Sequence, residues 1–323
     1  MNTDTPTLAF PDDISRAATL IQAGECVAIK TETVYGLAAD ATNERAIAKI
    51  FEAKARPASN PLIVHIASAA DMAKWAKDIP DIAFELANAF WPGPLSILLK
   101  KQNWVLDAVT GGQDTVVLRC PASKDFISLI QASGTGLAAP SANRYKFISP
   151  TTAAHVLTSL NGRIAAVVDG GSAEVGIEST IIDVTQDVPT ILRPGPIDDV
   201  ILERALGRKV RYAANLGITV PGSAKQHYQP DTPVFLLSKE ELERRGLRSN
   251  EGVISYSQPR LAGHLDDDCH IQLSDNASEY SAQFYAALHQ LDKLALSCIY
   301  LESTPTSTPW IAINNRIGRV VAG

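Results

Sequence analysis

Polar and charged side chains are concentrated between residues 31 and 66, in a stretch whose other residues are mostly apolar. They include Thr31, Glu32, Thr33, Lys54, Arg56, Asn60 and His65. A lysine supplies a mobile point charge and an arginine a planar set of donors, and both groups recognise phosphate oxygens. Burial in a core does not explain so many polar groups. The stretch therefore predicts a pocket for something small, polar and anionic.

Lys54 and Arg56 have an alternative explanation, because cations are favourable at the C-terminus of a solvated helix. Considered alone, that explanation is the better one. Beside Asn60 and a strand that carries His65, the pair is instead predicted to clamp a polyphosphate.

Thr31 and Thr33 are either ordinary strand formers or one wall of a polar pocket, and the sequence favours neither. In a strand, residues two apart face the same side. We therefore expect the two hydroxyls to lie together, with Glu32 on the opposite side.

Further polar side chains fall at the ends of predicted strands later in the chain. They are Arg119, Ser141, Asn143, Ser179, Thr180 and Arg193. Arg119 either caps the sheet surface or grips a substrate carboxylate through two parallel hydrogen bonds. Ser141 and Asn143 follow a proline, and turn chemistry explains them as well as ligand binding does. Ligands of α/β folds usually bind at strand ends, so polar side chains at the ends of several strands predict a single binding site.

Common nucleotide and metal motifs are absent from the sequence. It contains no G-x-x-x-x-G-K-[ST] phosphate loop and no H-E-x-x-H helix. Residues 134–139 match G-x-G-x-x-A, but they precede a predicted strand instead of following one, so we reject a dinucleotide loop. The four cysteines are far apart, which excludes a zinc knuckle and a disulfide framework and predicts buried free thiols.

Composition limits the class of protein. The chain has 323 residues, 46% hydrophobic residues, 20% charged residues and a formal net charge of −6. That charge argues against a protein that coats nucleic acid. The N-terminal residues lack the basic and apolar regions of a signal peptide, and no apolar run reaches the roughly 20 residues of a membrane span. We expect a cytoplasmic protein with no membrane contact.

The pattern of elements predicts two domains. Strands and helices are mixed from residue 13 to 206, which indicates an α/β (α+β) domain built on one large twisted sheet. Residues 1–12 are expected to be flexible. Residues 207–232 are rich in proline and glycine and lack periodicity, so they are expected to be a linker. Strands alternate with a long helix from residue 233 to 323, which predicts a small parallel, Rossmann-like C-terminal domain.

A series of motifs, taken in order, resembles the YrdC-domain family. They are Lys30-Thr31-Glu32-Thr33-Val34-Tyr35-Gly36-Leu37, Lys54-Ala55-Arg56-Pro57, Asn60-Pro61-Leu62-Ile63-Val64-His65, Trp91-Pro92-Gly93-Pro94-Leu95, Arg119-Cys120-Pro121, Ala139-Pro140-Ser141-Ala142-Asn143, Ser149-Pro150-Thr151, Asp169-Gly170-Gly171, Glu178-Ser179-Thr180-Ile181 and Leu192-Arg193-Pro194-Gly195-Pro196. Together with His227-Tyr228-Gln229-Pro230 in the linker, they make nearly the whole chain similar to the long, two-domain threonylcarbamoyl-AMP synthases of that family.

The resemblance implies a division of labour between two groups of residues. The threonine group is Thr33, His65, Arg119, Ser141, Ser179 and Thr180. The ATP group is Lys54, Arg56, Asn60, Thr115, Asn143, Thr151, Arg193 and either His227 or Tyr228. Lys54 and Arg56 would be the catalytic cations near the phosphates, and the linker would fold over the active site.

The implied reaction joins L-threonine, bicarbonate and ATP into threonylcarbamoyl-AMP with release of pyrophosphate. The product would pass to the transferase that makes the t6A modification of tRNA, and we expect at most a weak direct contact with tRNA. Mg²⁺ would be held mainly by the ATP phosphates, with no protein metal site. The chain departs from the family's usual pattern at Lys30, where proline is common, and at Ala39, where glycine is common. Proline fixes φ and removes a donor, so Lys30 would loosen this wall of the pocket or add a charge beside it.

Two other functions compete with this one. An RNA-binding module without ATP turnover is disfavoured by the net charge and by the lack of aromatic stacking pairs in the sequence. A carbamoyl-phosphate-using carbamoyltransferase is disfavoured because the related hydrogenase-maturation proteins carry zinc-finger cysteine pairs, which this chain lacks.

Overall fold

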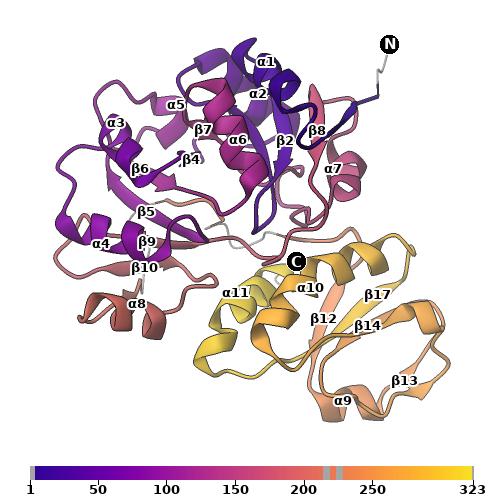
Figure 1. The fold of residues 1–323 in the computed structure, drawn as a ribbon. Coiled ribbons are helices and arrows are strands. Elements are labelled where there is room, and N and C mark those ends of the chain that lie inside the picture. Colours follow the sequence, from indigo (N-terminus) through magenta and orange to yellow (C-terminus); the bar gives the residue numbers. More distant parts are fainter. Residues whose placement is uncertain (1–3, 214–218, 223–227, 322–323) are drawn as a thin grey trace. The chain divides into compact units, whose positions relative to one another are not determined.

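The computed structural model describes residues 4–213, 219–222 and 228–321. Within them the chain forms two compact units. Unit 1 comprises residues 1–145, 150–174 and 178–223, and unit 2 comprises residues 146–149, 175–177 and 224–323. Each unit has its own sheet, as the ribbon in Figure 1 shows.

Unit 1 is built on a mixed sheet of eleven strands in the order β1-β8-β2-β3-β7-β4-β6-β5-β9-β10-β11. Antiparallel pairs, such as β2 with β3, alternate with parallel ones, such as β4 with β6. The strands are β1 (Thr7–Ala9), β2 (Val27–Lys30), β3 (Tyr35–Asp40), β4 (Ile63–His65), β5 (Leu95–Lys100), β6 (Thr115–Arg119), β7 (Leu137–Ala138), β8 (Ala166–Asp169), β9 (Thr180–Asp183), β10 (Thr190–Arg193) and β11 (Arg211–Tyr212). This confirms the large mixed sheet predicted for the first domain.

Helices cover the apolar faces of this sheet. They are α1 (Ile14–Gln22), α2 (Glu44–Lys54), α3 (Met72–Trp75), α4 (Asp81–Phe90), α5 (Asp107–Thr110), α6 (Lys124–Ser133), α7 (Ala153–Leu160) and α8 (Asp199–Leu206). The side chain of Asn43 accepts hydrogen bonds from the first turn of α2, and Ala55, in the left-handed region, ends that helix before Pro57. Ile47 and Ile50 of α2 are fully buried in the larger of the unit's cores. The start, end and buried stripe of α2 thus follow from its local sequence.

Two edge strands correct the predicted domain limits. Residues 7–9 form β1, which pairs in parallel with β8, so this part of the 1–12 segment is ordered. Arg211 and Tyr212, at the start of the predicted linker, form β11 and pair with β10. Both strands are too short to show a periodic pattern, and backbone pairing alone defines them.

Unit 2 contains a four-stranded parallel sheet in the order β12-β17-β14-β16. Its strands are β12 (Val234–Leu237), β14 (Glu251–Ser255), β16 (His270–Gln272) and β17 (Cys298–Glu302), and β13 (Gly246–Leu247) and β15 (Ala262–Gly263) form a separate pair. Its helices are α9 (Lys239–Arg244), α10 (Ala277–Asp292) and α11 (Ile311–Val320). The all-parallel sheet with alternating helices confirms the Rossmann-like prediction, although α9 and α11 were not predicted.

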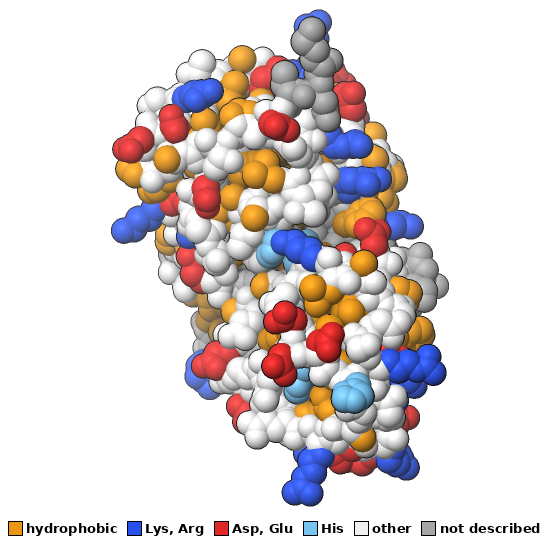
Figure 2. All heavy atoms as spheres, turned by 90° about the vertical axis from the view of Figure 1, so that its right-hand side faces the viewer, with side chains coloured by type: hydrophobic (Ala, Val, Ile, Leu, Met, Phe, Trp, Pro, Cys, Tyr) orange, Lys and Arg blue, Asp and Glu red, His pale blue; other side chains and the backbone are white. Residues whose placement is uncertain are grey.

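Other expectations are settled by the described residues. All four cysteines are buried and free, as predicted. Gly134 ends α6, and the 134–139 motif leads into β7, which confirms the rejection of a dinucleotide loop. On the face shown in Figure 2, basic and acidic side chains are interspersed. None of the helices in the described part of the chain has both the length and the apolar character needed to cross a membrane.

Candidate functional site

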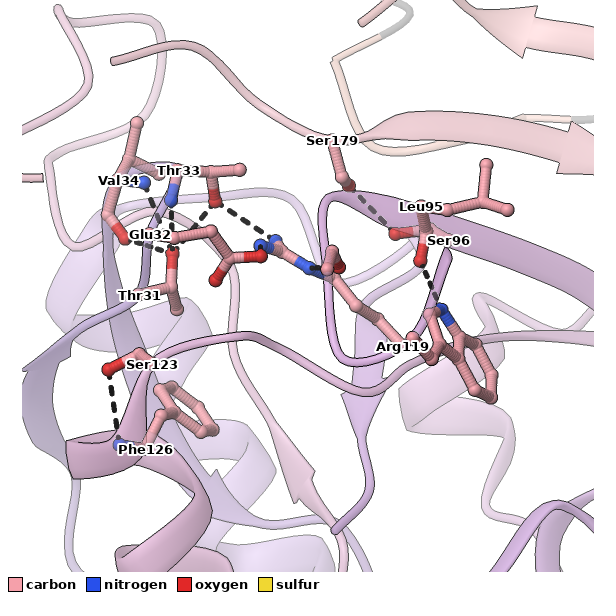
Figure 3. Close-up of polar contacts among 12 residues, drawn as sticks. Thr31, Glu32, Thr33, Val34, Leu95, Ser96, Arg119, Ser123, Phe126 and Ser179 are labelled. Atoms are coloured by element: carbon pink, nitrogen blue, oxygen red, sulfur yellow. Dashed lines mark hydrogen bonds and ion pairs between the residues drawn. The ribbon is translucent and has the colours of Figure 1, made fainter. Parts of the chain in front are cut away.

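A buried arginine is the centre of the first half of the site. Arg119 is the last residue of β6 and is 4% exposed. Its Nη1 donates to Thr33 Oγ1 at 3.0 Å, its Nη2 donates to Glu32 Oε1 at 2.6 Å, and its Nε donates to the carbonyl oxygen of Gly93 at 3.2 Å. Figure 3 shows the guanidinium pointing at Glu32 and Thr33. The second oxygen of Glu32, Oε2, is buried and has no hydrogen-bond partner among the described residues.

The loop between β2 and β3 differs from the predicted strand. Residues 31–34 lie outside the regular strands, and the hydroxyls of Thr31 and Thr33 are 2.7 Å apart. Thr31 Oγ1 also donates to the carbonyl oxygen of Val34 at 2.6 Å, which closes a tight turn. The two hydroxyls therefore meet as predicted, but for a different reason. Glu32 was wrongly expected on the opposite side, because a turn brings it to the same guanidinium as Thr33.

Gly93 holds its carbonyl in place through a turn that other residues cannot adopt. A Cβ at this position would lie 2.3 Å from the carbonyl oxygen of Phe90. The amide of Gly93 also donates to the carbonyl oxygen of Cys120 at 2.8 Å. The turn at residues 91–94 is therefore tied to the residue that follows Arg119.

A second buried arginine fixes Ser179. Arg193 ends β10, and its Nη2 donates to Ser179 Oγ at 3.0 Å and to the Ser179 carbonyl oxygen at 2.8 Å. Ser179 Oγ is also 2.7 Å from Ser96 Oγ in β5. Arg193 was predicted to hold the nucleotide. Its Nη2 contacts a residue of the threonine group, and its Nη1 donates to the carbonyl oxygen of Pro221 at 3.0 Å. The two predicted groups are thus joined at this point.

The hydroxyl of Thr180, a predicted member of the threonine group, is bonded to the backbone, and its role toward threonine stays a prediction. Its hydroxyl donates to the carbonyl oxygen of Ile197 at 2.8 Å and accepts from the amide of Ile197 at 3.0 Å. Because consecutive residues of an extended segment face opposite sides, Thr180 points away from the side on which Ser179 lies. Thr180 therefore anchors the segment that follows β10.

Lys54 lies in an unexpected environment. Its side chain is 1% exposed, and Nζ donates at 2.5 Å to the carbonyl oxygens of both Ser141 and Asn143. Its own carbonyl oxygen accepts from the amide of Tyr145 at 2.8 Å. Burial, reinforced by the nearby charge of Arg56, holds the pKa of Lys54 well below its usual value. The observed contacts make Lys54 a support of the 141–145 loop, and its phosphate role stays a prediction.

Arg56 follows α2 directly and is 9% exposed. Its Nη2 donates to the carbonyl oxygen of Pro61 at 3.0 Å, and its guanidinium lies 6.0 Å from the ring centre of Tyr145. Lys54 and Arg56 thus meet the same loop through Tyr145. The structure therefore brings together the Lys-x-Arg pair, Ser141 and Asn143, as predicted.

His65 is buried on β4 and is held neutral. Its ring lies 4.9 Å from that of Phe126, and its Nδ1 has no hydrogen-bond partner within the described ranges. Burial, with a further contribution from the charge of Arg119, lowers its pKa to about 3. Its register partner across the parallel pair is Arg119. A neutral imidazole at this position can donate or accept a hydrogen bond but carries no charge at neutral pH.

The remaining members of the ATP group are spread along unit 1. Thr115 begins β6, Asn60 lies in the loop before β4, and both are partly exposed. Thr151 is buried, with its hydroxyl 3.2 Å from His155 Nδ1. The nucleotide role of these three residues stays a prediction.

The linker motif falls partly outside the described residues. His227 is among the residues that the structure does not describe. Tyr228 belongs to unit 2, is 1% exposed, and has its ring 5.5 Å from that of Tyr285 and 5.7 Å from the guanidinium of Arg316. The position of the linker over the active site stays a prediction.

Lys30, the departure from the family pattern, ends β2 and makes an ion pair. Its Nζ lies 2.8 Å from Glu174 Oε1. Its carbonyl oxygen accepts from Ser123 Oγ at 2.9 Å, which ties the end of β2 to the start of α6. Lys30 therefore adds a charge at this wall, and Glu174 partners that charge.

Two residues of the site were not assigned from the sequence. Glu32 was quoted within a motif but given no role, and Ser96 was missed because a serine on a strand has no distinguishing pattern. The buried carboxylate beside two threonines was the available signal for Glu32. Within the part of the chain that the structure describes, there is no cluster of three or more His, Cys, Asp or Glu side chains that would hold a metal ion.

Comparison with known proteins gives the family. Residues 19–195 match the Sua5–YciO–YrdC family, which is described as "Telomere recombination", and residues 196–322 match the C-terminal domain of threonylcarbamoyl-AMP synthase. The chain belongs to this family. It is 38% identical to the threonylcarbamoyl-AMP synthase of Pyrococcus abyssi over 93% of this chain and 92% of that protein. It is 37% identical to the protein of the same name from Bacillus subtilis over 96% of this chain and 93% of that protein.

A solved structure of this family has the same fold over its full length. The crystal structure of P. abyssi Sua5 complexed with L-threonine matches with a TM-score of 0.86 and 34% sequence identity, covering 99% of this chain and 98% of that one. The Sua5 relationship thus extends over both units and confirms the resemblance drawn from the sequence motifs.

Proposed function

We propose that the protein is a threonylcarbamoyl-AMP synthase, which forms L-threonylcarbamoyladenylate and pyrophosphate from L-threonine, bicarbonate and ATP. The names and full-length coverage of its relatives support this proposal. The relative of known structure was solved with L-threonine bound, which supports an amino-acid substrate here.

The paired charges of Arg119 and Glu32 are the observation that carries the proposal. An amino acid is a zwitterion, so a buried site that binds it needs a donor for the carboxylate and an acceptor for the ammonium group. Arg119 has two N–H groups beyond those that make its three hydrogen bonds, and Glu32 Oε2 is a buried acceptor without a partner among the described residues. Thr33 and Ser179 add hydroxyls that would recognise the polar side chain of threonine.

The cationic residues of unit 1 suit the triphosphate. Arg56 follows α2, and its planar donors would grip phosphate oxygens. Lys54 would act through the loop that carries Ser141 and Asn143, which its ammonium group holds in place. The set of residues suits an anion and contains no ready-made metal cluster within the described ranges. We therefore propose that Mg²⁺ arrives with ATP and is held mainly by its phosphates.

The reaction needs alignment more than a protein nucleophile. The amine of threonine and bicarbonate give a carbamate and water, and a carbamate oxygen then attacks the α-phosphorus of ATP as pyrophosphate leaves. Arg119, Glu32 and Ser179 would orient the amino acid, and Arg56 would stabilise the charge that develops on the phosphates. The cations therefore supply orientation and electrostatic stabilisation.

The linker motif is proposed to complete the nucleotide site. A further solved structure of P. abyssi Sua5 carries alanines in place of an adjacent histidine and tyrosine. His227-Tyr228 is the only such dipeptide of this chain. We infer that one of these two residues contacts ATP. We further propose that the reaction takes place in the cytoplasm and that its product passes to the transferase that modifies tRNA.

A product assay tests the function directly. The protein is incubated with ATP, L-threonine and labelled bicarbonate, and each substrate is left out in turn. We expect a labelled adenylate only when all three are present, and strongly reduced formation by Arg56→Ala and Arg119→Ala proteins. Arg208→Ala is the control, because Arg208 makes an exposed ion pair with Glu85. If the two site variants form product at the rate of the control, the proposed site is wrong.

A further inference from the structure

A cavity of about 330 Å³ lies in unit 1, apart from the site described above. Residues Ile66 and Ala67, directly after β4, form part of its wall, and Gly134 and Gly136 form another part. His65, a predicted threonine ligand, immediately precedes Ile66. His65, Thr33 and Arg119 do not line the cavity, so it is separate from the amino-acid half of the site.

The cavity has an indole donor in its wall. Trp75 is 3% exposed and lines the cavity, and its Nε1 makes no hydrogen bond with the described residues. A Cβ on Gly136 would lie 2.5 Å from Cζ2 and 3.1 Å from Nε1 of this indole. The missing side chain of Gly136 thus keeps the N–H edge of the indole uncovered. This N–H group is therefore available to a ligand in the cavity that carries an acceptor.

A second tryptophan provides an aromatic surface at the mouth of the same cavity. Trp104 is 49% exposed, and its ring centre lies 4.8 Å from that of Trp75 at an angle of 53°. The two residues are 29 positions apart, so no local sequence pattern marks them as an aromatic pair. The structure thus corrects the expected lack of aromatic pairs. An exposed indole face favours a planar ring that stacks on it.

The remaining polar groups of the cavity favour a neutral ligand with hydrogen-bonding edges. The hydroxyl of Thr135 and the amide of Gln131 line the cavity. Lys74 lies at the cavity with its Nζ 2.8 Å from Asp71, so its charge is compensated locally. An aromatic hydrocarbon would leave the N–H of Trp75 unsatisfied, and a free phosphate would not use the aromatic surface.

We propose that this cavity binds a nucleobase, which stacks on Trp104 and accepts a hydrogen bond from Trp75 Nε1. The base has both properties that the cavity requires, a flat π face and an edge with acceptors. It would come either from a free nucleoside or from an unpaired base of RNA. The proposal does not depend on the activity proposed above.

Indole N–H resonances of the full-length, ¹⁵N-labelled protein provide the test. The chain has four tryptophans, so the Trp75 signal is assigned by its loss in Trp75→Phe. Adenosine, guanosine, cytidine, uridine and a single-stranded oligoribonucleotide are titrated separately. We expect at least one of them to shift the Trp75 signal saturably. Binding should weaken about tenfold or more in Trp104→Ala and much less in Trp104→Phe.

Controls separate this cavity from the ATP site. The shift should persist in Arg56→Ala, because Arg56 does not line the cavity. Tighter binding of the oligoribonucleotide than of every nucleoside would identify RNA as the source of the base, and equal or weaker binding would identify a free nucleoside. The proposal is overturned if no probe shifts the Trp75 signal or if the shift survives unchanged in Trp104→Ala. It is also overturned if N-acetyltryptophanamide binds and no nucleoside does.

Discussion

Glu32 is the residue on which the amino-acid half of the site depends, and Glu32→Gln tests it. The carboxylate is 10% exposed, accepts from Arg119 at 2.6 Å, and has a second oxygen without a partner in the described part of the chain. Glutamine keeps the size and one acceptor oxygen but removes the negative charge. The variant should therefore lose the charge-assisted hydrogen bond to the ammonium group of threonine.

The expected size of the effect follows from the type of interaction. A hydrogen bond to a charged group contributes about 1.5–3 kcal/mol, which corresponds to roughly a 10- to 150-fold rise in the KM for threonine. Removing one partner of a buried ion pair outright costs about 3–5 kcal/mol of stability. Because glutamine still accepts a hydrogen bond from Arg119, the loss of stability should be smaller than this.

Steady-state kinetics with a matched control separates these effects. Initial rates of adenylate formation are measured against threonine concentration at saturating ATP and bicarbonate, together with thermal unfolding. Glu174→Gln is the control, since Glu174 pairs with Lys30 at 2.8 Å but has a side chain that is 61% exposed. Exposed pairs contribute only about 0–1 kcal/mol, so the control should keep its KM. A folded Glu32→Gln protein with an unchanged KM for threonine would refute the assigned role.

Five further substitutions, which make three predictions, follow from the same structure. The pKa of His65 is about 3 in the folded protein, against an ordinary value of 6.5. The free energy of unfolding should therefore fall as the pH is lowered from 6.5 towards 3, by up to about 1.4 kcal/mol per pH unit. Denaturant unfolding of His65→Gln should lack this pH-dependent contribution. Gly93→Ala should lower both stability and activity, because the added Cβ would clash with the backbone. Gly318→Ala is the control, since Gly318 lies within α11 and a Cβ there meets open space. In the same unfolding assay it should raise the free energy of unfolding by about 0.5–1 kcal/mol. Ser179→Ala should raise the KM for threonine, whereas Thr180→Val should lower the melting temperature and leave that KM unchanged. A raised KM in Thr180→Val with an unchanged KM in Ser179→Ala would contradict these roles.

Much of the fold was accessible from the sequence because local chemistry defines it. The side chains of Asn43, Thr152 and Asp198 cap their helices, and short polar residues at such positions are a helix-start signal that can be read from the sequence. Strands β1 and β11 were missed because their backbone pairing partners are distant in sequence and no local pattern marks them.

The site was predictable in its members but not in their contacts. Residue types at strand ends indicated Arg119 and Thr33, yet they lie 86 positions apart, and only the folded sheet brings them together. Lys54 shows the limit most clearly, because the same Lys-x-Arg pattern fits an open phosphate ligand and a fully buried loop support. The choice between these roles depends on burial, which the sequence does not specify for a single residue.

Isothermal titration of L-threonine and ATP into two conservative variants tests the central claim, that separate arginines serve the two substrates. Arg119→Lys and Arg56→Lys both keep the charge but lose the planar pair of donors. We predict that Arg119→Lys weakens threonine binding about tenfold or more with little change for ATP, and that Arg56→Lys does the opposite. Equal effects of either variant on both ligands, or no effect on either ligand, would contradict the account.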